Sequence, residues 1–251
     1  MTMSQMLRLR FELHARKKIY HYRVAQAQRL VKDTLAKSDN PYIAFSTGKD
    51  SLVMAYLVWE QAPDAPAVYF DADCSYPESR ELLQQIAQEH PLTIWPTEPL
   101  LDTFERLGGP TAQGIEYQTM KSTVYEPIER LLNEFHFDCS FVGLRAEESW
   151  GRKQLQRYRG GLFWHKQWSL WECCPVISWG YNDIWAYVVS NKLEYCKVYD
   201  RLWDAPEEDQ RLSYWAGETK HRYGRWAWLR QLYPGLYNEF VDRFPEIARY
   251  T

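Results

Sequence analysis

The chain is 251 residues long, is 45% hydrophobic and has a formal net charge of −3. Its apolar runs fall short of the roughly 20 residues that cross a bilayer, and its charged N-terminal segment does not read as a signal peptide. Membrane and secreted classes are therefore excluded, and a cytoplasmic enzyme built from one large domain and an appendage is expected.

The N-terminal segment is strongly basic. Residues 1–38 hold nine Lys and Arg against two acids. A basic helical arm over 1–38 is predicted, and its cations could contact the phosphates of nucleic acid. The alternative is an amphipathic helix with a basic face in water, packed through Leu9, Phe11, Tyr20, Val24 and Leu30.

The next segment, residues 41–53, reads PYIAFSTGKDSLV, an apolar strand that turns into the apolar face of a helix. Such a turn presents backbone N–H groups without intrahelical partners, and the helix dipole favours an anion there. Gly48 allows close approach of a ligand, and hydroxyl and ammonium donors surround it. A polyphosphate site is predicted, with the nucleotide-binding residues Ser46, Thr47, Gly48, Lys49, Asp50 and Ser51.

Two carboxylates suggest a metal. A carboxylate beside phosphates is repulsive unless a cation lies between them or the side chain caps the helix, so Asp50 predicts Mg²⁺. A second apolar strand, 67–71, ends at Asp71. Since ligands of doubly wound sheets bind at the carboxyl ends of strands, both side chains are predicted to converge on one metal ion or one ribose. Helix capping is the alternative for Asp71 and for Asp73.

A block of arginines follows later in the chain. Strands are predicted near 92–95 and 139–143, and the second of these leads into Gly143, Arg145 and Arg152. At a sheet edge, a guanidinium can bind two oxygens of a phosphate or sulfate. Arg145 is therefore predicted to contact the nucleotide. Gly143, Arg145 and Arg152 also resemble a pattern of the phosphoadenosine phosphosulfate reductase family, and this resemblance implies that Gly143 contacts the nucleotide as well and that both arginines stabilise its charge.

Tryptophan crowds the stretch from Trp150 to Trp185, where arginines and a lysine are interleaved. These rings could stack an adenine, a modified base or single-stranded nucleic acid, or they could be core or dimer contacts. A fifth strand is predicted at 174–177, followed by a helix capped by Asn182 or Asp183.

The order of these blocks carries a family resemblance. The string STGKDS at 46–51 resembles the SGGKDS signature of the PP-loop ATP pyrophosphatases, with Thr47 in place of the first Gly. AVYFDAD at 67–73, GLRAEES at 143–149 and PVISWGYNDIWAY at 175–187 are similar to blocks of phosphoadenosine phosphosulfate (PAPS) reductases and of the small subunit of sulfate adenylyltransferase. A Walker A loop is excluded, because Ile43 and Asp50 occupy positions where it needs Gly and Ser or Thr.

The resemblance implies an α/β fold of the adenine nucleotide alpha hydrolase type. The predicted domain is Rossmann-like, with about five mostly parallel strands and helices on both faces. Its boundaries are predicted as a basic arm over 1–38, a PP-loop nucleotide-binding domain over 39–200 and a Trp-rich helical appendage over 201–251.

The cysteines bear on the reaction. Sulfonucleotide reductases use a thiolate nucleophile, which the family carries in its C-terminal tail, whereas no Cys follows Cys196 here. Without CxxC spacing, neither zinc nor an iron–sulfur cluster is expected. Cys74 follows Asp71 closely, but it lacks a basic neighbour to lower its pKa.

The favoured function is therefore adenylylation, in sulfur metabolism or nucleic-acid modification. An oxygen nucleophile would attack the α-phosphorus of ATP and release pyrophosphate, with Lys49, Asp50, Arg145 and Arg152 as catalytic residues and positioning and electrostatics as the main contributions. One alternative is a PAPS or APS reductase that uses a thiol in trans. Another is a nucleotide-gated nucleic-acid-binding or defence protein without turnover. The acceptor stays open, and a homodimer is one option.

Overall fold

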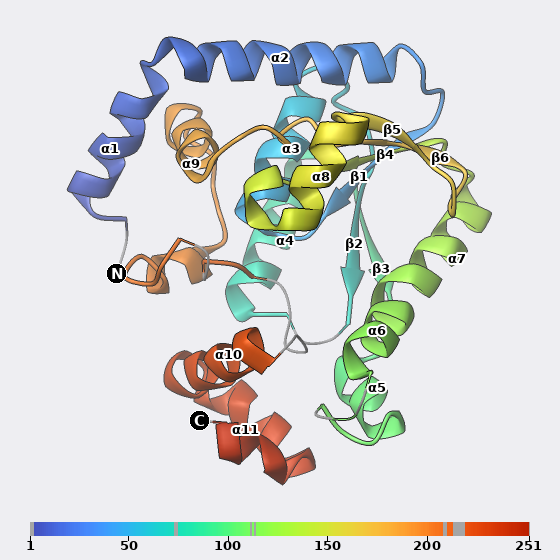
Figure 1. Ribbon diagram of the computed structural model, residues 1–251, viewed down its shortest axis with the longest axis vertical. Coiled ribbons are helices and arrows are strands. Elements are labelled where there is room, and N and C mark those ends of the chain that lie inside the picture. Colours follow the sequence, from blue (N-terminus) through green and yellow to red (C-terminus); the bar gives the residue numbers. More distant parts are fainter. Residues whose placement is uncertain are drawn as a thin grey trace. The chain divides into compact units, whose positions relative to one another are not determined.

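The computed structural model describes residues 3–72, 75–110, 112, 114–207, 210–212 and 219–250. These residues form a mostly parallel β-sheet with helices around it (Figure 1). The expectations for Asp73 and Cys74 fall outside the described residues. Among those that are described, no helix is both long enough and apolar enough to cross a membrane.

The helices and strands alternate along the chain, as expected for an α/β protein. In order they are α1 (Gln5–Ala15), α2 (Lys18–Leu35), β1 (Pro41–Phe45), α3 (Lys49–Trp59), β2 (Ala67–Asp71), α4 (Pro77–Glu89), β3 (Leu92–Pro96), α5 (Leu100–Arg106), α6 (Ile115–Met120), η1 (Lys121–Tyr125), α7 (Glu126–Phe135), β4 (Cys139–Val142), η2 (Ala146–Glu148), α8 (Trp150–Arg159), β5 (Leu162–His165), β6 (Leu170–Cys173), α9 (Tyr181–Ser190), η3 (Lys197–Arg201), α10 (Thr219–Leu232), α11 (Pro234–Arg243) and η4 (Pro245–Tyr250).

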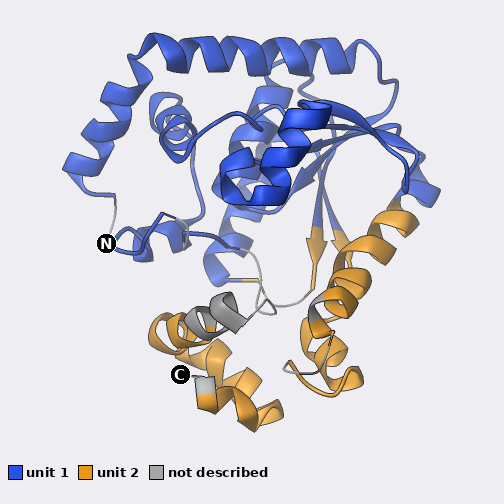
Figure 2. Cartoon of the chain, in the orientation of Figure 1, with its two compact units in different colours: residues 1–69, 76–94, 132–212 blue, residues 70–75, 95–131, 213–251 orange. Residues whose placement is uncertain are grey.

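The chain divides into two compact units (Figure 2). The first unit comprises residues 1–69, 76–94 and 132–212, and it carries β1, β4, β5, β6 and the loop at 46–51. The second comprises residues 70–75, 95–131 and 213–251, and its helices include α5, α6, α10 and α11. The domain boundaries expected from the sequence stay a prediction.

The sheet has the strand order β3-β2-β1-β4-β6-β5. β1 pairs in parallel with both β2 and β4, β4 pairs in parallel with β6, and β5 is an antiparallel edge strand. The connection after β1 leads to β2 on one side, whereas β4 lies on the other. This reversal of strand order places the ligand-binding switch point at the carboxyl ends of β1 and β4.

The core of the first unit is built around α3. This helix buries residues on all sides, among them Leu52, Val53, Met54, Leu57 and Val58. A helix that is apolar all round belongs in the interior, and α3 accordingly contacts β1, β4, α2 and α9. The helix that begins at the candidate site is thus fixed along its whole length.

Helices cover both faces of the β5–β6 hairpin. Leu162 pairs with Cys173, whose Sγ accepts a hydrogen bond of 3.3 Å from Thr34 of α2. The next residue, Phe163, packs in a cluster with Leu155 of α8. Because successive strand residues point to opposite faces, α2 and α8 lie on opposite faces of the hairpin.

Two expectations about the elements are wrong in detail. The strand β6 ends at Cys173, and residues 175–178 form a turn, since Pro175 has no N–H to donate to a sheet. The apolar run there is explained by burial of Val176 and Ile177 in the core. The antiparallel strand β5 was not expected, because its alternation is hidden in the basic, aromatic stretch.

The N-terminal arm is two helices, α1 and α2. Its apolar side chains include Phe11 and Tyr20, which are buried, as the amphipathic alternative requires, whereas Leu9 is 47% exposed. Buried Asp183 at the start of α9 accepts hydrogen bonds from His14 of α1, at 2.8 Å, and from Arg23 of α2. Part of the arm's positive charge therefore anchors it to the first unit.

Candidate nucleotide site

The loop between β1 and α3 is a helix N-terminus of the predicted kind. β1 ends at Phe45, and Gly48 is the N-cap of α3 with an extended backbone (φ −69°, ψ 150°). Ser51 Oγ accepts a hydrogen bond of 3.2 Å from the backbone N–H of Ser46 and donates one of 3.0 Å to the carbonyl of Gly48. These bonds close the loop at the N-terminus of α3, where the helix dipole favours an anion.

Thr47 has a left-handed backbone, with φ of 57°. This conformation is costly for a β-branched residue and free for glycine, which the signature has at this position. The side chain of Thr47 is 2% exposed, and its Oγ1 donates a hydrogen bond of 3.1 Å to Ser79 Oγ of α4. Thr47 therefore bears a backbone strain that glycine would not have, and in return its side chain forms a hydrogen bond that links the loop to α4.

Lys49 is 1% exposed, and every polar group of this residue at the site is engaged. Its Nζ lies 3.1 Å from Asp50 Oδ2 and donates a 3.1 Å hydrogen bond to the carbonyl of Gln210, and its backbone N–H donates to Tyr199 Oη at 3.0 Å. The two contacts of Nζ use two of the three N–H donors of the ammonium, so a phosphate oxygen would bind the third or replace the Gln210 carbonyl.

Asp50 joins Lys49 to Arg145. Arg145 comes from the loop after β4, is 3% exposed, and its Nε donates a 2.5 Å hydrogen bond to Asp50 Oδ1. Burial would raise the pKa of Asp50, but the Lys49 and Arg145 charges outweigh it, so the pKa lies below its usual value. Asp50 is therefore ionised and shared between two cations.

Arg145 contacts more acids than one guanidinium can neutralise. Besides Asp50, its Nη1 pairs with Glu147 and its Nη2 lies 3.8 Å from Glu148. Burial alone would lower the pKa of Arg145, and these three carboxylates raise it. Glu148 also pairs with Arg152. With Lys49 included, three cations face three carboxylates, and a further cation, Arg211, donates a hydrogen bond of 3.2 Å to the backbone carbonyl of Glu148, so acids balance most of the positive charge of the predicted anion site.

Gly143 has a steric role. A Cβ atom built there would lie 2.6 Å from the backbone nitrogen of Ser51 and 2.8 Å from the carbonyl carbon of Asp50. Only glycine lets the end of β4 approach the first turn of α3 this closely. The structure thereby brings Gly143 and Arg145 to the loop at 46–51, and it links Arg152 to Arg145 through Glu148.

The described donors do not fit Mg²⁺ at Asp50, because both of its oxygens bind cationic side chains. Asp71, the other expected ligand, is the last residue of β2 and belongs to the second unit. No cluster of three or more His, Cys, Asp or Glu that could hold a metal ion occurs within the described ranges. Mg²⁺, and the convergence of Asp50 with Asp71, stay predictions.

Four cysteines are described, and all are buried free thiols: Cys139, Cys173, Cys174 and Cys196. Burial raises the pKa of each, to about 11 at Cys196 and about 12 at Cys173. A thiol that is buried and protonated is a poor nucleophile. None of these four groups is prepared for attack on sulfur.

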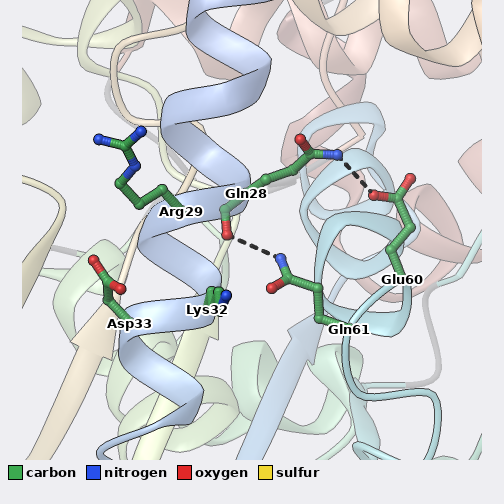
Figure 3. A pocket seen from close by; sticks show the side chains of 6 residues that line it. All are labelled: Gln28, Arg29, Lys32, Asp33, Glu60 and Gln61. Carbon is green, nitrogen blue, oxygen red and sulfur yellow. Dashed lines mark hydrogen bonds between the residues drawn. The ribbon is translucent and has the colours of Figure 1, made fainter.

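A polar hollow lies elsewhere on the first unit (Figure 3). It is lined by residues of α2 and by Glu60 and Gln61, and Gln28 of α2 donates a hydrogen bond of 3.2 Å to Glu60 Oε2. Glu60 and Gln61 follow the last residue of α3, about 16 Å along the helix from the loop at 46–51. This hollow is separate from the candidate nucleotide site.

Comparison with known proteins identifies the family. A family model for the phosphoadenosine phosphosulfate reductase domain matches residues 40–205, well over half of the chain. The chain belongs to this family. A PAPS reductase of Xylella fastidiosa is 27% identical over 168 residues, which cover 65% of this chain and 68% of that protein. An adenosine 5′-phosphosulfate reductase of Halalkalibacterium halodurans is 24% identical over 201 residues, covering 74% and 84% respectively.

Solved structures agree in fold. PAPS reductase from Candida auris, in a phosphate complex, has a TM-score of 0.58 and 15% identity, and the match covers 82% of this chain and 95% of that one. FMN adenylyltransferase of Candida glabrata, in complex with ATP, has a TM-score of 0.55 and 14% identity, covering 76% and 65%. At these identities the likeness concerns the fold. The expected family of enzymes and the Rossmann-like fold are confirmed.

Four residues at the site were not expected from the sequence. Glu147 and Glu148 bind the arginines, although they lie in the string GLRAEES at 143–149, of which only Gly143 and Arg145 were predicted to bind. Tyr199 lies in the segment LEYCKVYD at 193–200, for which no binding role was predicted. Gln210 contributes a backbone carbonyl, for which no side-chain pattern exists.

Proposed function

We propose that this family member binds an adenine nucleotide at residues 46–51, prefers ATP, and transfers the adenylyl group to an oxygen nucleophile. The observation that carries the proposal is the buried chain of charges Lys49–Asp50–Arg145 at the N-terminus of α3. It places an ammonium and a guanidinium from separate elements beside a helix N-terminus, an arrangement suited to an extended polyphosphate.

The residues would act by positioning and by charge. The loop at 46–51 and the N-terminus of α3 hold the β- and γ-phosphates, and Asp50 keeps Lys49 and Arg145 in place. The acceptor oxygen attacks the α-phosphorus, the bond from that phosphorus to the bridging oxygen breaks, and pyrophosphate leaves with the electron pair. Arg145 and Arg152 stabilise the charge that develops on the phosphoryl oxygens.

A thiol-dependent reductase is the second candidate, and the specific support for it is the kind of relative that the chain matches. Those relatives are named PAPS and APS reductases. In that reaction a thiolate would attack the sulfur of the sulfonucleotide, and the thiol would come from a partner, since the four described thiols are buried.

One experiment compares the two. The full chain is incubated with ATP or with PAPS, each with and without a dithiol reductant, and pyrophosphate and sulfite are measured alongside the Kd of each nucleotide. We expect tighter binding of ATP than of PAPS, and pyrophosphate release when a suitable acceptor is present. Sulfite release from PAPS without pyrophosphate release from ATP would overturn the adenylylation proposal in favour of reduction.

Lys49→Ala tests the site itself. We expect the Kd for ATP to rise at least ~10-fold, since a charge-assisted hydrogen bond of about 1.5–3 kcal/mol is lost. Lys32→Ala, an exposed lysine on α2, is the matched control. Equal ATP binding by wild type and Lys49→Ala would show that the nucleotide does not bind at this loop, and it would contradict both candidate reactions.

A further inference from the structure

Helix α8 has one face toward the protein and one toward water. Leu155 packs on the cluster that contains Phe163, and Arg152 pairs with Glu148. At 100° per residue, the opposite side of the helix carries Trp150, Lys153, Gln154, Arg157 and Tyr158. We call these five residues the α8 face.

The α8 face exposes aromatic rings next to cations. Trp150 is 76% exposed and Tyr158 is 75% exposed, which places them among the most exposed large side chains described. Lys153 and Arg157 are exposed and form no ion pair with any described residue, and the Arg157 guanidinium lies 5.7 Å from the centroid of the Tyr158 ring. Rings and cations are therefore both available to a ligand.

The surrounding sequence has one sign of charge. Residues 150–171 contain five Lys and Arg and no Asp or Glu, in a chain whose net charge is −3. The positive charge of this segment is thus local, and it is not balanced by acids of the same segment. A surface of this kind attracts an anionic partner.

We propose that the α8 face binds single-stranded nucleic acid. Unpaired bases can stack on Trp150 and Tyr158, and Lys153 and Arg157 can contact the phosphates between them. The two aromatic positions are eight residues apart, about 12 Å along the helix, which spans roughly three to four nucleotides at 3.4 Å each. A duplex would offer the phosphates without free base faces.

Charge also argues against a second copy of the chain as the occupant. Two-fold symmetry would set the same surface of both copies face to face, so Lys153 and Arg157 of one copy would meet the same cations of the other. A polyanion is complementary to the α8 face, whereas the α8 face is not complementary to itself.

The test measures binding of a labelled 12-residue oligothymidylate by fluorescence anisotropy between 50 and 200 mM salt. Trp150→Ala and Tyr158→Ala should each weaken binding ~5- to 150-fold, the range for loss of one base–aromatic stack. Removing both Lys153 and Arg157 should reduce the slope of log K against log salt by ~1.4, about 0.7 for each phosphate contact. A duplex of equal length should bind more weakly.

Two controls locate the site. Trp164→Ala removes another exposed tryptophan, 45% exposed, whose side chain points to the opposite face of the hairpin from α8, and it should leave binding unchanged. The double change Lys17→Ala and Lys18→Ala removes two exposed cations of the N-terminal arm and should have a small effect. Lys49→Ala should not alter oligonucleotide binding, so failure of the proposed nucleotide chemistry can be told from failure of this surface.

Several outcomes overturn the proposal. They are absence of oligonucleotide binding, duplex binding as tight as single-strand binding, or loss of binding in the arm variant while the Trp150 and Tyr158 variants still bind. Sedimentation velocity adds another, since conversion of a wild-type dimer into monomers by Trp150→Ala would assign the α8 face to self-association. Circular dichroism of each variant establishes that it is folded.

Discussion

Two buried aspartates of the first unit, Asp50 and Asp183, look alike and are arranged for different purposes. Each lies in the first turn of a helix and binds two basic side chains. The partners of Asp50 are the adjacent Lys49 and the distant Arg145. Asp183 is 1% exposed and its partners, His14 and Arg23, come from the N-terminal arm. The Asp50 side chain is 15% exposed.

The difference lies in the partners. Asp183 accepts from His14, from Arg23 and from the backbone N–H of Gly180 at 2.7 Å, so its oxygens are occupied by permanent structural donors. Arg145, the partner of Asp50, also faces two glutamates, of which Glu147 is 45% exposed. Asp183 fixes the N-terminal arm to α9, whereas Asp50 holds Arg145, which can exchange a carboxylate for a substrate anion.

Asp183→Asn should have the largest effect on stability. The change removes the carboxylate that accepts from His14, Arg23 and the Gly180 backbone, and a hydrogen bond to a charged group is worth about 1.5–3 kcal/mol. Since Arg23 is 32% exposed and keeps water as a partner, we expect the free energy of unfolding in urea to fall by ~3 kcal/mol, while nucleotide binding by the folded protein persists. Asp33→Asn, at an exposed position of α2, is the control. A loss below about 1 kcal/mol would contradict the structural role of Asp183.

Glu172 is a third buried carboxyl, and it sharpens the comparison because it forms no ion pair with any described residue. Burial raises its pKa from 4.5 to about 7. The folded protein then binds a proton that the unfolded chain releases above pH 4.5, so this contribution to stability is complete below pH 4.5 and is lost as pH rises through 7.

We therefore compare the free energies of unfolding of Glu172→Gln and of the wild type. From pH 5 to pH 8, the difference should shift in favour of the variant by up to ~3 kcal/mol. Urea unfolding at both pH values measures the difference, with exposed Glu134→Gln as control. A wild-type protein whose stability relative to Glu172→Gln is the same at both pH values would refute a raised pKa at this site.

Arg145→Lys tests whether the geometry at Asp50 matters beyond charge. Lysine keeps the positive charge but loses the planar fork that contacts several oxygens. We expect the Kd for ATP to rise ~10- to 100-fold by isothermal titration calorimetry. The same exchange at exposed Arg29 should change nothing. Equal binding by Arg145→Lys would mean that only the charge of Arg145 is needed.

Glu147→Gln should have the smallest effect, in the opposite direction. It removes one of the three carboxylates that compete for Arg145, so the net charge of the site rises by one unit. We expect the Kd for ATP to fall ~3- to 10-fold, in keeping with a partly exposed pair worth roughly 1 kcal/mol. Glu134→Gln again serves as control, and weaker ATP binding by Glu147→Gln would exclude competition.

Much of the fold follows from local patterns. The apolar runs before Ser46 and at 67–71 predicted β1 and β2 closely, because parallel strands buried on both faces are continuous apolar segments. β5 escaped prediction because an edge strand with exposed Trp164 and half-buried His165 lacks that signature. The apolar run at 174–177 was wrongly predicted as a strand, because a buried turn and a buried strand can have the same apolar sequence.

The site was predictable in part for a related reason. Residues 46–51 and Arg145 lie in strings whose spacing alone identifies them, although their role in binding stays a prediction. The acids that neutralise the arginines and the Gln210 carbonyl that binds Lys49 depend on how distant segments meet. No single segment encodes such contacts, so the balancing of the site's cations by acids could not be predicted from the sequence.

The glycine at position 143 has a consequence for how this protein can vary. Since even a methyl group there would approach the Ser51 nitrogen to 2.6 Å, below the 3.0 Å that real contacts respect, any replacement must push β4 and α3 apart. The absence of a side chain at position 143 thus sets the distance between the loop that carries Arg145 and the loop at 46–51. Side chains of increasing size at this one position would widen that distance in steps and show how far the two loops can separate before nucleotide binding is lost.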